Sequence, residues 1–284
     1  MLRAERWDGD QSVRPQHASL SVDIDLTYLP VLPRAESLAA IDAAMKRIAE
    51  RIRKSLRGAT VTEGAIQPEK AVTKLLIRVG GVQTKIEVTP VLRGCVYEPE
   101  LLTVSRSVEE TFGFAEVRVV PFADLYGGKI VAALDRQHPR DLFDVRDLLA
   151  NEGIDETLRR AFLVYLLSYN RPMFEVLAPR RKPIEAEFRR GFQGMTAEPV
   201  SINALTRARE SLIETVVGKM PEQHRRFLLS FERGKPEWSL LELPGASELP
   251  AVRWRRENLD KLRSAERAQL VSKLEAVLTK SKKK

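Results

Sequence analysis

The segment from Ser19 to Thr27 has the residue pattern of a β-strand with one polar and one apolar face. Its two acidic residues, Asp23 and Asp25, alternate with apolar residues: Leu20, Val22, Ile24 and Leu26. Side chains two positions apart on a strand project from the same face, about 6.5–7 Å apart. The pattern therefore restricts the segment to a strand that packs one face on a core and presents two carboxylates on the other.

Two interpretations of this carboxylate pair remain open. The spacing suits two Mg²⁺ ions about 3.5–4 Å apart, which can bind the phosphates of a nucleotide, activate an attacking oxygen and stabilise the leaving pyrophosphate. An antiparallel strand with one solvated face shows the same alternation. Asp is disfavoured in strands, however, so two of them among Leu, Val and Ile favour a functional role.

The composition limits the classes of protein to which the chain can belong. Its 284 residues suffice for one large or two ordinary domains, and 47 Lys and Arg against 39 Asp and Glu give a net charge of +8, which attracts polyanions such as RNA or DNA. A single cysteine, Cys95, excludes an intramolecular disulfide and a zinc site built from cysteines. Apolar runs are shorter than the ~18 residues of a transmembrane helix, and the N-terminus lacks a signal-peptide pattern. We therefore expect a cytoplasmic protein that does not bind membranes.

Strand patterns occur early in the chain and helical patterns occur late. Apolar residues recur at helical spacing from Leu38 to Ile52, and the alternating segments 71–79 and 82–91 predict a hairpin that turns at Gly80 and Gly81. A further edge strand is expected within 101–120. The later pattern is helical over 122–136, 141–150, 155–169, 201–217, 222–231 and from residue 265 onward. This order predicts an α+β domain followed by a helical domain.

Glu87 is the candidate for a third carboxylate. It is a polar residue on a predicted strand whose Ile86 and Val88 face inward by alternation. Taken alone, an exposed strand residue is the simpler interpretation. If its strand pairs with the strand of Asp23 and Asp25, three carboxylates lie together, and their repulsion in the absence of a cation favours metal binding.

Gly127 and Gly128 directly precede Lys129 in a predicted helix. Each glycine costs about 1 kcal/mol relative to alanine in a helix interior, which indicates close approach of a ligand or another backbone, with tight helix packing as an equally simple explanation. Lys129 can supply a cation for the phosphates of a nucleotide, although a solvated lysine is the simpler interpretation.

Asp141 and Asp144 lie three positions apart on one face of the next predicted helix. The helix dipole alone explains an acid near the helix start, which accounts for Asp141. Asp144 lies among apolar residues, where a carboxylate needs a partner such as Lys129 or Arg140, and we favour a role in the site for it.

Two later segments, Arg253–Arg256 and Gln223–Phe227, combine basic residues with an aromatic residue. Both can hold an RNA backbone by charge. The alternative is that both lie on amphipathic helices whose charged faces are solvated. The three histidines do not cluster in sequence, so they show no metal-ligand spacing.

Several motifs occur in an order that resembles the AbiEii/AbiGii nucleotidyltransferase toxins, which are related to the MenT toxins. These motifs are the segments Leu20–Pro30, Lys129–Leu134, Arg140–Val145, Leu167–Pro172 and Gly194–Val200. The resemblance implies a polymerase-β-like nucleotidyltransferase domain, with a mixed sheet flanked by helices, and a helical C-terminal domain. The domains expected are a non-matching segment 1–18, a nucleotidyltransferase domain 19–150, a helical domain 151–279 and a basic tail 280–284.

The resemblance also implies a function, the toxin half of a toxin–antitoxin or phage-defence system. We expect a Mg²⁺-dependent enzyme with two metal ions that transfers a nucleotide from an NTP to RNA, in particular to the 3′ end of tRNA, as some relatives do. An AbiEi-like antitoxin is the expected protein partner.

Matching the family motifs residue by residue implies a role for each candidate. Asp23, Asp25 and Glu87 fall at the metal-binding carboxylates and, with Lys129 and Asp144, at the catalytic positions. The residues implied in nucleotide binding are Ser21, Lys129 and Asp144, with Arg140 and Asp141 as weaker neighbours.

One feature of the family is missing from this sequence. Its members carry a Gly-Gly-[Ser/Thr]-Ala-Leu helix start shortly before the D-x-D strand, where backbone amides and a hydroxyl receive the triphosphate. Residues 1–18 contain no such motif. The alternative expectation is therefore a catalytically impaired, N-terminally truncated relative that only binds its antitoxin or RNA.

Overall fold

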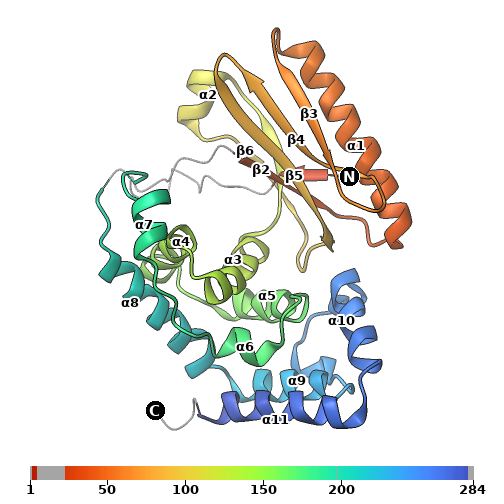
Figure 1. Ribbon diagram of the computed structural model, residues 1–284, viewed down its shortest axis with the longest axis vertical. Helices are drawn as coiled ribbons and strands as arrows, with labels where there is room; N and C mark the ends of the chain where they lie inside the picture. The colour runs from red at the N-terminus through yellow and green to blue at the C-terminus, as the bar shows by residue number, and fades with distance from the viewer. Residues whose placement is uncertain (1, 5–22, 197, 281–284) are drawn as a thin grey trace. The chain divides into compact units, whose positions relative to one another are not determined.

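The computed structural model describes residues 2–4, 23–196 and 198–280, and Ser21 lies outside these ranges. The chain forms two compact units, Met1–Pro121 and Phe122–Lys284 (Figure 1). The domain boundary expected from the sequence falls later, at residue 150, because that expectation includes the helices over 122–136 and 141–150 in the sheet domain. Their packing places them in the helical unit.

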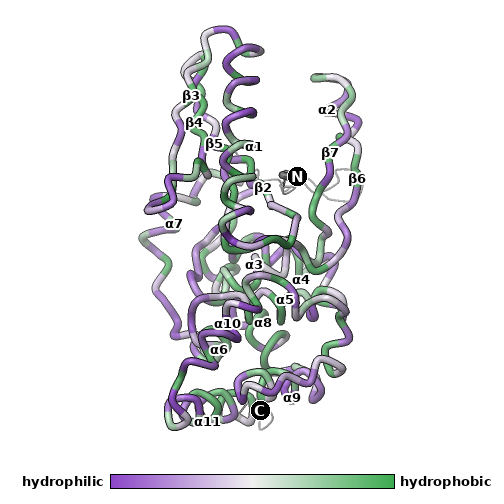
Figure 2. The backbone as a smooth tube through the Cα atoms, turned by 90° about the vertical axis from the view of Figure 1, so that its right-hand side faces the viewer, coloured by the Kyte–Doolittle hydropathy of each residue, from purple (hydrophilic) through white to green (hydrophobic). Residues whose placement is uncertain are grey.

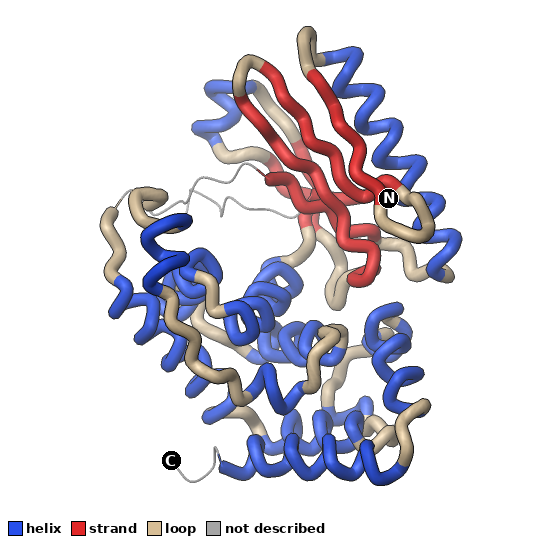
Figure 3. Tube along the Cα trace, viewed as in Figure 1, coloured by secondary structure: helices blue, strands red, loops and turns tan. Residues whose placement is uncertain are grey.

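The N-terminal unit contains a mixed sheet, drawn in red in Figure 3. Its strand order is β3-β4-β5-β2-β1-β7-β6. The strands are β1 (Leu2–Ala4), β2 (Asp23–Tyr28), β3 (Thr60–Ala65), β4 (Val72–Val79), β5 (Val82–Arg93), β6 (Glu100–Thr103) and β7 (Glu116–Val119). β2 runs parallel to β5 and antiparallel to β1, while β4 and β5 form the hairpin that the sequence predicts. The turn residues Gly80 and Gly81 both have positive φ, at 57° and 80°, which favours glycine there.

Helix α1 (Arg34–Ser55) packs against β3, β4 and β5. Its Ile41, Met45 and Ala49 are fully buried against apolar strand residues such as Leu75 and Val88. These helix residues lie four apart, as the helical pattern of the sequence predicts. The core of this unit therefore lies between α1 and the strands β3, β4 and β5.

Two elements of the N-terminal unit differ from the sequence expectations. The segment 101–120, expected to hold one edge strand, contains β6, helix α2 (Arg106–Phe112) and β7. The sequence does not predict β3, because Val61 is its one buried residue and the strand lacks a run of alternating apolar side chains. This strand forms because it pairs with β4, and not because of a local sequence pattern.

The C-terminal unit is helical. Its α-helices are α3 (Phe122–Arg136), α4 (Pro139–Ala150), α5 (Glu156–Leu167), α6 (Met173–Leu177), α7 (Glu185–Gly191), α8 (Ile202–Ile213), α9 (Glu222–Glu232), α10 (Pro250–Asp260) and α11 (Ser264–Lys280). A π-helical turn, Glu214–Gly218, extends α8. Purple and green segments alternate along most of these helices in Figure 2, as expected for helices that bury one face. Among the described residues, the helices all lack the combination of length and apolar character needed to cross a membrane.

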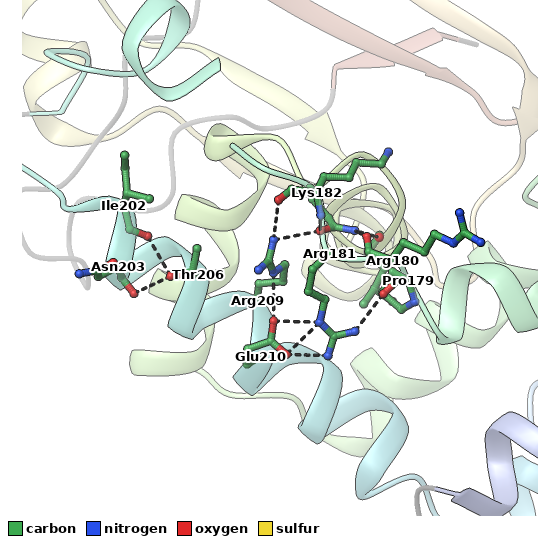
Figure 4. A network of polar contacts seen from close by, with 11 residues as sticks. Pro179, Arg180, Arg181, Lys182, Ile202, Asn203, Thr206, Arg209 and Glu210 are labelled. Atoms are coloured by element: carbon green, nitrogen blue, oxygen red, sulfur yellow. Dashed lines mark hydrogen bonds and ion pairs between the residues drawn. The ribbon is translucent and has the colours of Figure 1, made fainter. Parts of the chain in front are cut away.

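A network of polar contacts fixes the segment Pro179–Lys182 to α3 and α8 (Figure 4). The Gln137 side chain accepts hydrogen bonds from the backbone N–H of Lys182 at 3.0 Å and from Nη1 of Arg209 at 3.1 Å. Its amide donates to the Arg180 carbonyl at 2.7 Å, and Arg181 pairs with Glu210 at 2.6 Å. Buried polar groups are satisfied here, so the network has a structural role.

Gly127 permits the close packing of α3 against α5. A Cβ atom at this position would lie 3.1 Å from the backbone of both Ala161 and Phe162 and 3.1 Å from the Tyr165 ring. At Gly128 the nearest atom, also of Tyr165, would be 3.4 Å away. Helix packing therefore explains the glycine pair, and of the two explanations left open by the sequence this is the one that the contacts support.

We predict that Gly127→Ala destabilises the protein by about 1–3 kcal/mol, because overpacking against backbone atoms outweighs the helix propensity of alanine. Gly191→Ala is the matched control, since Gly191 is also helical and a Cβ atom there would meet nothing within 4 Å. Thermal unfolding followed by circular dichroism measures both. Equal melting temperatures for the two variants would contradict the packing explanation.

Candidate active site

The register of β2 and β5 brings the strand carboxylates onto one face of the sheet. Asp23 pairs with Lys85, and Asp25 pairs with Glu87. Neighbouring strands lie about 4.8 Å apart, and paired residues project from the same face. The pairing that the sequence analysis required for Glu87 is therefore present.

Lys85 lies between two of these carboxylates. Its Nζ is 3.1 Å from Oδ2 of Asp23 and 2.9 Å from Oε1 of Glu87, while Nζ of Lys74 lies 3.4 Å from Oε2 of Glu87. Burial opposes the charged form of Lys85, but the hydrogen bonds to Glu87 and Asp23 outweigh it and raise the pKa of the ammonium. The carboxylates thus already hold a cation.

Sequence reasoning missed Lys85, although a signal for it was present. Lys85 and Glu87 are two apart on one strand and so share a face. The contact with Asp23, however, depends on the register between β2 and β5, which no local pattern specifies.

The donor atoms of this cluster suit a hard divalent cation, because Mg²⁺ prefers carboxylate oxygens. Within residues 23–196 and 198–280, no three His, Cys, Asp or Glu side chains converge on a single metal position. Lys85 accounts for this arrangement, since its ammonium draws Asp23 and Glu87 to itself. A Mg²⁺ ion at these carboxylates would compete with Lys85 for Oδ2 of Asp23 and Oε1 of Glu87.

A second charged pair lies in the C-terminal unit, between α3 and α4. Nζ of Lys129 donates to Oδ2 of Asp144 at 2.7 Å, and both side chains are largely buried, at 18% and 14% exposure. Burial raises the pKa of Asp144, while the charge and hydrogen bond of Lys129 oppose this shift. Lys129, and not Arg140, is therefore the partner that the buried carboxylate needs.

The two weaker candidates have other partners. Asp141 forms an ion pair with Arg136 at 2.9 Å. Arg140 donates from Nε to the Gly191 carbonyl at 3.3 Å and from Nη2 to Sδ of Met195 at 3.3 Å. These contacts connect α4 to neighbouring segments of the unit.

The basic segment Gln223–Phe227 is partly buried: His224, Arg225 and Phe227 lie in the interior, while Gln223 and Arg226 are exposed. Arg225 donates to the carbonyls of Val217 at 2.9 Å and Met220 at 2.9 Å, next to the π-helical turn. His224 is fully buried with Nε2 3.1 Å from Oε1 of Glu156, and burial lowers its pKa. Neither a solvated face nor an RNA contact describes these two residues.

A mixed sheet bearing neighbouring carboxylates, followed by a helical unit, is the arrangement of a nucleotidyltransferase. The chain matches the family of the nucleotidyl transferase AbiEii toxin of type IV toxin–antitoxin systems over residues 18–258, and it belongs to that family. The family and fold class expected from the sequence are thereby confirmed.

A solved structure with the same fold is MenT4, a nucleotidyltransferase toxin from Mycobacterium tuberculosis H37Rv. The two chains are 18% identical and superpose with a TM-score of 0.55, over 93% of this chain and 85% of MenT4. No curated protein sequence matches the chain.

We predict that Lys129→Met destabilises the protein by about 3 kcal/mol at neutral pH, because it leaves a buried carboxylate without its cation. The folded state, in which the pKa of Asp144 is raised, binds the proton more readily than the unfolded state, so ionisation of Asp144 costs stability as the pH rises. The loss relative to the wild type should shrink when the pH is lowered and Asp144 becomes protonated.

Denaturant unfolding at neutral and mildly acidic pH tests this prediction. Lys129→Met/Asp144→Asn is the control, since the neutral amide removes the unpaired charge and should recover part of the stability. A loss that is independent of pH would show that the ion pair does not control the ionisation of Asp144.

Proposed function

We propose that the protein transfers a nucleotide from an NTP to RNA in a Mg²⁺-dependent reaction, with the 3′ end of tRNA as acceptor. The observation that carries this proposal is the pairing of Asp25 with Glu87 on parallel strands, with Asp23 on the same face, in a member of the AbiEii family. The net charge of +8 favours a polyanionic acceptor.

In this proposal each charged group has a distinct role. Asp23, Asp25 and Glu87 hold Mg²⁺, which would supply positive charge to the triphosphate and to the leaving pyrophosphate. The acceptor hydroxyl forms a bond to the α-phosphorus, the bond to pyrophosphate breaks, and Glu87 takes the hydroxyl proton. Lys129 neutralises phosphate charge, and Asp144 holds its ammonium in place.

The partners follow from the same proposal. Membership of a type IV toxin–antitoxin family implies an antitoxin, and we propose an AbiEi-like protein in that role. Action on tRNA implies a cytoplasmic location, and modification of the tRNA end stops translation, which suits a role in phage defence.

A second function is favoured by the position of Lys85. Because this lysine competes with a metal ion for Asp23 and Glu87, a chain in which it stays in place would bind metal weakly there. Such a protein is catalytically impaired and acts only by binding its antitoxin or RNA.

We predict that Asp23→Asn lowers nucleotide transfer by about 100-fold or more, because a metal ligand supplies several kcal/mol of transition-state stabilisation. The assay incubates purified protein with tRNA, Mg²⁺ and each labelled NTP in turn. Glu100→Gln, which removes an exposed carboxylate from the edge strand of the same sheet, is the control and should keep full activity. Absence of labelling by the wild type with every NTP would sink the enzymatic proposal.

We also predict that Lys85→Gln strengthens Mg²⁺ binding, because it removes the ammonium that competes for Asp23 and Glu87. Calorimetric titration with Mg²⁺, without nucleotide, measures the affinity directly. Lys54→Gln removes an equal charge from an exposed site on α1 and should leave the affinity unchanged. If neither the wild type nor Lys85→Gln binds Mg²⁺, also when the titration is repeated with each NTP present, the binding-only function is the correct one.

A further inference from the structure

Trp254 on α10 has an unusually exposed indole ring. Its exposed fraction is 58%, whereas Trp238 packs its ring on Phe227 at 5.4 Å and on Phe231 at 6.1 Å between centroids. Large aromatic side chains normally contribute most of their area to a core or an interface. Trp254 contributes little to the core of this unit.

The orientation of α10 is fixed by other residues. Ala251, Val252 and Leu259 bury the inner face of the helix. Nη1 of Arg255 donates to the carbonyls of Tyr169 at 3.2 Å and Arg171 at 3.1 Å. Trp254 therefore faces outward on a helix that is anchored without it.

One basic side chain lies against this ring, and two others belong to the same helix. Lys261 follows Trp254 by seven residues, about two helical turns. Its Nζ lies 5.6 Å from the centroid of the Trp254 ring. Arg253 and Arg256 are close to Trp254 in sequence on α10, and both are exposed. Ion pairs of the neighbouring arginines are Arg263 with Glu266 and Arg267 with Asp260.

Those neighbouring arginines have acidic partners, which distinguishes them from Arg253, Arg256 and Lys261. Within the described part of the chain, none of these three forms an ion pair with an acidic side chain. Their charge is thus available to an anionic ligand. Glu257, also on α10, is the acidic residue nearest to them in sequence.

An exposed aromatic ring among uncompensated cations matches the chemistry of single-stranded nucleic acid. Bases stack on aromatic rings, and lysine or arginine neutralises the flanking phosphates. Sequence-specific and end-specific RNA recognition uses unpaired nucleotides in this way. An acidic protein surface would use the cations but leave the indole without a planar partner.

We propose that Trp254 is a stacking platform for an unpaired base of the RNA acceptor and that Arg253, Arg256 and Lys261 bind its phosphates. This inference rests on the proposed function for the identity of the ligand as RNA. It adds a docking surface on the C-terminal unit, formed by these four residues, to the charged groups already described.

The first test measures binding of fluorescein-labelled tRNA without any NTP. Trp254→Ala should weaken binding on the order of tenfold, whereas Trp254→Phe, which keeps an aromatic ring, should retain most of the affinity. Phe112→Ala is the matched control, because Phe112 is 82% exposed on α2 among acidic residues. Unchanged affinity in Trp254→Ala overturns the proposal.

Intrinsic fluorescence gives an independent readout. The chain contains three tryptophans, and a base stacked on Trp254 should quench part of their emission when tRNA is added. Trp254→Phe should abolish that part of the quenching. Equal quenching in the wild type and in Trp254→Phe would show that the base stacks elsewhere or not at all, and would contradict the proposal.

The salt dependence of binding tests the cations. Arg253→Gln/Arg256→Gln should lower the slope of log affinity against log salt by about 0.7 for each phosphate that the protein no longer neutralises. Arg57→Gln, an exposed arginine next to α1, should leave the slope unchanged, and Glu257→Gln should tighten binding by removing repulsion. A slope that is the same in the double variant and the wild type overturns the role of the two arginines.

Failure of this inference and failure of the proposed function give different results. If the wild type labels RNA from an NTP but Trp254→Ala binds tRNA as tightly as the wild type, the platform is wrong and the enzyme stands. If the wild type labels nothing but binds tRNA through Trp254, the enzymatic function is wrong and the docking surface stands.

Discussion

Parallel pairing of β2 with β5 is the constraint on which the carboxylate cluster depends. Ile86 and Val88 are 9% and 4% exposed, so the apolar face of β5 can only point into the core beneath α1. Glu87, between them, must then lie on the opposite face, and the register places it next to Asp25. A slip of one residue would turn Glu87 into the core, so hydrophobic burial sets the position of the charged groups.

Each unit compensates its acidic groups with lysine. In the sheet, Lys85 contacts both Asp23 and Glu87. In the helical unit, Lys129 offsets the cost of burying Asp144. For Asp144, the charge and hydrogen bond of Lys129 oppose the rise in pKa that burial causes. The groups proposed for catalysis are therefore part of the electrostatic balance of the folded chain as well.

Local patterns in the sequence predict most of the elements, since strand alternation and helical spacing arise within single segments. The β4–β5 hairpin and α3 are confirmed for this reason. What could not be predicted depends on contacts between distant segments. The position of Lys85 requires the register of two strands, and the choice between ligand and packing at Gly127 requires α5. Burial of Arg225 likewise depends on carbonyls from the π-helical turn and α11.

The ion pairs of Lys85 also affect how the N-terminal unit can fold. Because an internal side chain already balances the charge of Asp23 and Glu87, the sheet can be completed on the nascent chain without waiting for an ion from solution. Folding of the N-terminal unit then does not depend on metal binding. Under the proposed function, a metal ion that binds Asp23 and Glu87 would have to displace the ammonium of Lys85, so folding of this unit would not by itself complete the metal site.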